Sequence, residues 1–229
     1  MAFAGQTCAQ TAIWWVGERV MTQSIWARRV LMAALIAGIS YMVPVLALWK
    51  GPAIILWKGL GVGLLALYAA CSGADRDVRQ IALVMAFGAA GDVVLDIAFT
   101  AGAALFALGH LVAIHLYWRN RDQNCTGLHR VAALALFLAV PALSWALSGQ
   151  LPVLGYAMVL GAMAATAWVS HFPRHWVGLG AVLFAVSDLL IFARMGPLAG
   201  SMLPQLLIWP LYFGGQALIA TGVVRARLS

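Results

Sequence analysis

Residues 80–97 read QIALVMAFGAAGDVVLDI, a run apolar enough to cross a membrane that nevertheless carries two aspartates, Asp92 and Asp96. A membrane-spanning helix requires about 20 predominantly apolar residues. Runs of similar length recur along the chain, separated by segments rich in Pro, Gly or charge. The predicted spans are approximately 30–48, 52–71, 80–97, 101–118, 131–148, 151–170, 175–194 and 203–223. Membrane β-barrels show alternating segments of about 10 residues instead, so the chain is predicted to be an all-α, polytopic transmembrane helical bundle.

The composition agrees with a membrane protein. Of 229 residues, 64% are hydrophobic and only 9% are charged, whereas a soluble domain carries about 25% charged residues. The net charge is +7, but most Lys and Arg residues lie between the apolar runs and form no contiguous basic face, so no nucleic-acid partner is expected. Three cysteines (Cys8, Cys71 and Cys125) give an odd number with no metal-binding spacing, so no disulfide framework is implied.

Basic residues predict the orientation of the bundle. With the N-terminus in the cytoplasm, eleven of the fourteen Lys and Arg residues fall in inside segments. Only Lys50 and Arg194 fall outside, and Lys58 lies within a span. Short cytoplasmic loops carry the excess of basic residues, so both termini are predicted to be cytoplasmic. If the source is bacterial, the expected location is the cell (inner) membrane.

The chain divides into an N-terminal segment, residues 1–29, and a single transmembrane domain, residues 30–229. The first segment is more polar and contains three tryptophans. It lacks the apolar core of a cleavable signal peptide, and we expect either an interfacial helix or a tail.

Three acids lie within predicted spans: Asp92, Asp96 and Asp188. A lipid-exposed Asp at mid-span is unfavourable by at least about 2.5–3.5 kcal/mol, so these residues are expected to face the bundle interior. Asp92 lies about 18 Å along its span and Asp188 about 20 Å along its own, both in the outward direction. Lys58 lies about 9 Å from the outer end of the second span. The side chains of Asp92, Asp188 and Lys58 are therefore predicted at similar heights in the membrane. They would lie either in a functional pocket or in a polar clamp between helices.

Other polar residues lie at comparable depths. They are His110, Tyr212 and Gln216, with Ser187 preceding Asp188. We expect them to join the acids in one outward-opening pocket. Ser187 is not surrounded by the G-x-S-x-G of a nucleophile elbow. No arrangement of helical His residues suits a catalytic zinc ion, and neither a metal nor a cofactor is expected.

Several motifs resemble those of the YhhN-like family of lysoplasmalogenases. Span three contains Gly91-Asp92-Val93-Val94-Leu95, similar to G-D-x-x-L, and Phe99 to His110 is similar to F-x-x-G-x-x-x-F-x-x-G-H. Residues 180–188 read GAVLFAVSD and residues 212–219 read YFGGQALI, similar to G-A-x-L-F-x-x-S-D and Y-x-x-x-Q-x-L-I. Lys58 stands where the family has an early Lys. The chain departs from the family at Gly59, where Pro is common, and at Ala113, where Tyr is common.

The resemblance implies hydrolysis of the vinyl ether bond of a lysophospholipid substrate, a lysoplasmalogen, among membrane lipids. Asp92 and Asp188 would then be the catalytic pair, one neutral and one ionised, as in glycoside hydrolysis through a similar cation. Lys58, Asp96, His110, Ser187, Tyr212 and Gln216 would bind substrate or support the pair. The residues themselves leave open a proton- or cation-coupled transporter, a non-catalytic lipid-binding protein, and a hydrolase of another lipid bond. The sequence sets no oligomeric state.

Overall fold

The computed structural model describes residues 25–228. Most of the predicted N-terminal segment lies outside the described residues, and residues 25–29 begin the first helix. Residues 25–40 are helical and lead through a turn at Tyr41 into α2 (Met42–Leu46). The remaining elements are α3 (Pro52–Ser72), α4 (Arg76–Leu95), α5 (Phe99–Arg119), α6 (Gly127–Ser148), α7 (Leu151–Trp168), the π-helical turn η1 (Arg174–Gly178), α8 (Leu179–Arg194) and α9 (Leu203–Leu228).

The predicted all-helical bundle is confirmed. Eight helices between Ile25 and Leu228 are long and apolar enough to cross a membrane. No β-strand occurs within residues 25–228, where one isolated bridge pairs Arg121 with Ser170. The chain is therefore an integral multi-pass membrane protein. The cytoplasmic placement of both termini stays a prediction.

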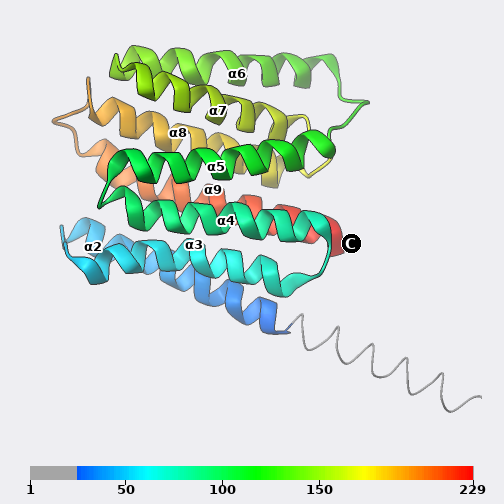
Figure 1. Cartoon of the computed structure of the whole chain (residues 1–229), viewed down its shortest axis with the longest axis horizontal. Coiled ribbons are helices and arrows are strands. Elements are labelled where there is room, and N and C mark those ends of the chain that lie inside the picture. Colours follow the sequence, from blue (N-terminus) through cyan, green and yellow to red (C-terminus); the bar gives the residue numbers. More distant parts are fainter. Residues whose placement is uncertain (1–24, 229) are drawn as a thin grey trace, which may run out of the picture.

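The helices lie side by side, and their connections gather at two ends of the bundle (Figure 1). Short connections between α2 and α3, α4 and α5, α6 and α7, and α8 and α9 form one end, here called the Lys50 end. The opposite end, here called the C-terminal end, carries the other connections and the end of α9. Pro52 and Pro152 stand in the first turns of α3 and α7, where their missing N–H groups are not needed.

The break between the third and fourth spans falls earlier than the sequence predicted. Helix α4 ends at Leu95 and α5 begins at Phe99. Asp96, expected within the third span, instead follows the end of α4, and its side chain is 37% exposed. The prediction that Asp96 faces the bundle interior is wrong, because α4 ends at Leu95, one residue before Asp96.

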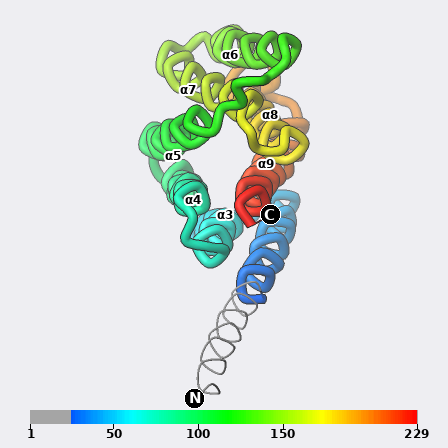
Figure 2. Tube along the Cα trace, turned by 90° about the vertical axis from the view of Figure 1, so that its right-hand side faces the viewer, coloured from blue at the N-terminus to red at the C-terminus, as the bar shows by residue number. Residues whose placement is uncertain are grey.

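Viewed end-on, α3, α4 and α5 follow one another on one side, and α8 and α9 lie on the other (Figure 2). Helix α7 contacts both α5 and α8, while α9 contacts α3 and α4. Helices α8 and α9 approach closely at Gly180 and Gly215, where a Cβ on either residue would come within 2.7 Å of the other's carbonyl oxygen. Small residues permit such close helix packing in membranes.

Gly59 also permits close helix packing. A Cβ there would come within 2.6 Å of a Val93 methyl group and 3.1 Å of the Ala89 carbonyl oxygen. The departure from the family pattern at this position therefore accompanies a tight contact between α3 and α4.

Candidate active site

A cavity of about 490 Å³ lies between the helices towards the Lys50 end. Its lining comes from α3, α4, α5, α7, α8 and α9 and is mostly apolar. Six of its lining residues are polar side chains relevant to the chemistry: Lys58, Asp92, Tyr156, Ser187, Asp188 and Tyr212. The structure therefore brings Asp92 and Asp188, which are far apart in sequence, to one cavity.

Asp92 lies on α4 near the end of the helix, and the residue is 2% exposed. Its Oδ2 accepts a hydrogen bond of 2.8 Å from the Tyr212 hydroxyl on α9. Gln216, one turn further along α9, lies beside this hydroxyl: a Cβ at Gly88 would meet Gln216 Nε2 at 3.1 Å and the Tyr212 oxygen at 3.5 Å. Tyr212 therefore orients the Asp92 carboxyl towards the cavity.

Asp188 lies on α8, is 6% exposed, and is held in the same way. Its Oδ2 accepts a hydrogen bond of 2.6 Å from the Tyr156 hydroxyl on α7. The Tyr156 oxygen lies 3.1 Å from His110 Nε2 on α5, so three side chains from three helices form one hydrogen-bonded chain. Ser187 Oγ donates to the Phe184 carbonyl at 2.8 Å and lies 3.4 Å from Asp188 Oδ1.

Three aromatic rings separate the cavity from the residues behind it. Phe106, Phe184 and Tyr212 pack edge to face, with centroids 5.3 to 6.1 Å apart. His110 and Gln216 lie behind these rings at a second, much smaller void and do not line the main cavity. The expectation that both join the acids in one pocket is therefore corrected: His110 reaches Asp188 only through Tyr156, and Gln216 lies beside Tyr212.

Lys58 on α3 lines the cavity and forms an ion pair of 3.1 Å with Asp96. The Lys58 side chain is 16% exposed. Because Asp96 is more exposed and does not line the cavity, the ion pair sits at the rim. Lys58 is thus the only cation among the cavity-lining residues that the structure describes.

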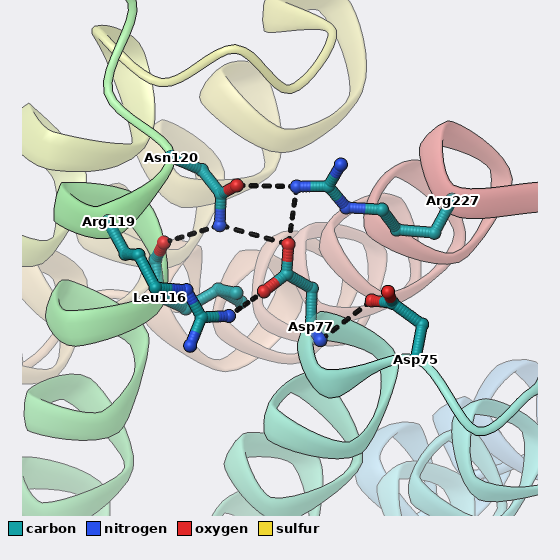
Figure 3. Close-up of polar contacts among 6 residues, drawn as sticks. All are labelled: Asp75, Asp77, Leu116, Arg119, Asn120 and Arg227. Carbon is teal, nitrogen blue, oxygen red and sulfur yellow. Dashed lines mark hydrogen bonds and ion pairs between the residues drawn. The ribbon is translucent and has the colours of Figure 1, made fainter.

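A second group of polar residues surrounds the buried Asp77 at the C-terminal end (Figure 3). Asp77, which falls between the predicted spans 52–71 and 80–97, is buried in the first turn of α4 and forms ion pairs with Arg119 of α5 and Arg227 of α9. Asn120 donates to Asp77 at 3.0 Å, and Asp75 accepts from the Asp77 backbone N–H at 2.8 Å. The predicted span begins at residue 80, after the charged segment 75–79, whereas α4 begins at Arg76.

Tyr156 is the site residue that sequence reasoning missed. Apart from Thr166, it carries the one hydroxyl in an otherwise apolar helix, and neither charge nor a recognised motif marks it. Only the pairing with Asp188 across two helices reveals its role. Between Ile25 and Leu228, no group of three or more His, Cys, Asp or Glu residues is placed to hold a metal ion.

The fold and the cavity define a class: an integral membrane protein with two buried carboxyls on one largely apolar cavity. The sequence profile of the YhhN family matches residues 53–223. Two curated relatives, from Mycobacterium bovis and Mycobacterium tuberculosis, are each called lysoplasmalogenase. Each is 32% identical over 177 residues, covering 72% of this chain and 67% of the relative. No solved structure matches. The chain belongs to the YhhN family.

Proposed function

We propose that the protein is a membrane-embedded hydrolase that cleaves the vinyl ether bond of lysoplasmalogens, releasing a fatty aldehyde and a glycerophospho-alcohol. One observation carries the proposal: Asp92 and Asp188 line the same cavity, and each accepts a hydrogen bond from a tyrosine hydroxyl. Neither forms an ion pair with a residue that the structure describes. The names of the relatives point to the same reaction.

The reaction needs one proton donor and one anion. A neutral carboxyl protonates the β-carbon of the vinyl ether, which leaves an oxocarbenium ion at the α-carbon. The second carboxyl, ionised, stabilises this cation and accepts a proton from the attacking water. The resulting hemiacetal collapses to the aldehyde and the alcohol. Asp92 and Asp188 supply the two carboxyls, and burial in a low-dielectric cavity favours having one of them neutral near neutral pH.

The remaining cavity residues suit a single-chain phospholipid. Lys58 at the rim attracts the phosphate, while the apolar walls accept the hydrocarbon chain. The tyrosines, with His110 and Gln216 behind them, keep the two carboxyls in place. With cytoplasmic termini, the Lys50 end and its cavity lie in the outer half of the cell membrane.

The direct test mixes detergent-purified protein with a lysoplasmalogen and measures products by mass spectrometry. We expect a fatty aldehyde, and in D2O the aldehyde should carry deuterium at the carbon next to the carbonyl, because that carbon receives the proton. Matched substrates with a saturated ether or an ester at the same position should remain intact. Release of fatty acid from the ester without aldehyde from the vinyl ether would contradict the proposal, as would ion flux in liposomes without hydrolysis.

A further inference from the structure

The cavity is not equally enclosed on all sides. Its lining residues from α4, α8 and α9 are buried or half-buried, and they include both aspartates. Its exposed lining residues come only from α5 and from the start of α7. They are Phe99, Thr100 and Ala104, and Gln150, Pro152 and Gly155. Since α5 and α7 are neighbours in the bundle (Figure 2), the cavity meets the protein surface between these two helices.

This opening begins at the helix ends, at Phe99 and Gln150, and continues along the sides of both helices to Ala104 and Gly155. Gly155 is about 6 Å from the start of α7, and Ala104 is about 8 Å from the start of α5. The exposed residues that continue the same helix faces are apolar: Leu108 on α5 is 47% exposed and Met158 on α7 is 52% exposed. Beyond the opening, the surface of both helices is therefore suited to hydrocarbon, and the opening itself contains no charged lining residue from either helix.

We propose that the hydrocarbon chain of the lipid substrate enters sideways between α5 and α7, with Ala104 and Gly155 bordering its path. This inference rests on the proposed function and adds the route and orientation of the substrate. The chain lies towards α5 and α7, and the phosphate lies towards Lys58 on α3. The bond between chain and headgroup is then beside Asp92 and Asp188, which line the cavity between those two parts.

Small side chains keep this route open. No atom lies within 4 Å of a Cβ built on Gly155, so the space beside it is empty. A Cβ at this position therefore meets no neighbour, and we expect the ring of Gly155→Trp to occupy the opening. Met158→Trp is its control, because it places the same ring on the exposed face of α7 without lining the cavity. Ala104→Phe and Leu108→Phe form a second matched pair on α5.

The kinetic experiment compares a long-chain lysoplasmalogen with a short-chain, water-soluble analogue. Gly155→Trp and Ala104→Phe should lower kcat/KM for the long chain about tenfold or more, because the added ring occupies the path of the chain, and should leave the short chain within about twofold. Met158→Trp and Leu108→Phe should change neither substrate. Equal losses on both substrates, or equal effects of blocking and control variants, would overturn the lateral route.

A second measurement does not depend on turnover. A saturated-ether lysophospholipid with a photoreactive group on its chain should label the cavity-lining residues of α5 and α7. Gly155→Trp should abolish the label, whereas Met158→Trp, outside the lining, should retain it. Labelling confined to α8 and α9 would overturn the lateral route. If the wild type labels as expected but releases no aldehyde, the proposed reaction fails and the lipid route stands.

Discussion

Asp77 and the pair formed by Asp92 and Asp188 are all buried acids, yet the two regions satisfy them differently. At the C-terminal end, Asp77 is paired with Arg119 and Arg227 (Figure 3). In the cavity, each aspartate contacts a neutral tyrosine hydroxyl. Asp77 is enclosed by its partners, whereas the cavity leaves room beside Asp92 and Asp188 for a ligand.

The difference separates a structural carboxylate from a reactive one. Two arginines fix the charge of Asp77, and the ion pairs join α4, α5 and α9. A tyrosine hydroxyl can orient a carboxyl in either protonation state, because it both donates and accepts hydrogen bonds. Burial of an acid therefore does not indicate catalysis by itself. A reactive carboxyl is indicated instead by a neutral hydrogen-bonding partner and by free space for a ligand beside the carboxyl.

The largest expected effect is the loss of activity in Asp92→Asn and in Asp188→Asn. Asparagine keeps the shape of the side chain and its acceptor oxygen but cannot exchange the proton. We expect kcat for aldehyde release to fall about a hundred- to ten-thousandfold, the range of general acid–base catalysis. Thermal unfolding in detergent should change little. A variant with normal kcat would remove that aspartate from the mechanism.

Asp77→Asn should show the opposite pattern. The substitution leaves Arg119 and Arg227 without their shared anion, and we expect the free energy of unfolding to fall by about 2–4 kcal/mol. This is less than the largest losses measured for broken buried ion pairs, because both arginines keep some contact with water. The kcat of the folded fraction should stay within about twofold. Denaturant titration and activity per folded molecule measure the two quantities.

Asp122→Asn is the matched control for Asp77→Asn. Asp122 pairs with Arg174 at 3.4 Å, and both side chains are more exposed to solvent than Asp77. Its loss should lower the free energy of unfolding by less than about 1 kcal/mol. If both variants lose equal stability, the ion pairs of Asp77 are no stronger than a peripheral ion pair, and the structural role assigned to Asp77 is wrong.

The sequence predicted the fold closely because span length and loop charge are local properties. The eight predicted spans match the eight apolar helices to within a few residues at most ends. The errors fall where local composition is ambiguous. Asp96 and Asp77 each lie within two residues of a helix end, and a displacement of that size decides whether a carboxylate is buried or exposed.

The site was only partly predictable for a different reason. Depth along each span placed Asp92, Asp188 and Lys58 at similar heights, and the structure brings all three to one cavity. Depth says nothing about rotation around the helix axis or about which helices are neighbours. Those properties place His110 behind the aromatic rings and bring Tyr156 against Asp188.

A smaller effect should follow from removing the tyrosine hydroxyls. Tyr156→Phe and Tyr212→Phe each leave one carboxyl without its hydrogen bond, and a lost buried hydrogen bond corresponds to about 1–3 kcal/mol. We expect kcat to fall about ten- to a hundredfold if the full amount is lost in the transition state. The control is Tyr117→Phe, because the buried Tyr117 hydroxyl has no hydrogen-bond partner among the described residues. A drop in kcat in Tyr117→Phe equal to that in the other two variants would show a general packing effect instead.

The smallest effect is expected at the rim of the cavity. Lys58→Gln removes a partly exposed cation, so we expect KM for a lysoplasmalogen to rise about fivefold, with kcat nearly unchanged and the free energy of unfolding altered by less than about 1 kcal/mol. The rise should shrink at high ionic strength, because salt screens the attraction to phosphate. Lys50→Gln is the control: Lys50 lies at the same end but does not line the cavity.

Asp96→Asn removes the other partner of the Lys58 ion pair and should change KM in the opposite direction. In the wild type, Lys58 forms an ion pair with Asp96 at 3.1 Å, as Arg119 and Arg227 do with Asp77. If Lys58 serves the substrate and not the fold, releasing it from Asp96 should lower KM about two- to threefold with little change in stability. A rise in KM together with a marked loss of stability would mean that the rim pair is a clamp of the same kind as the Asp77 cluster, and that the phosphate is bound elsewhere.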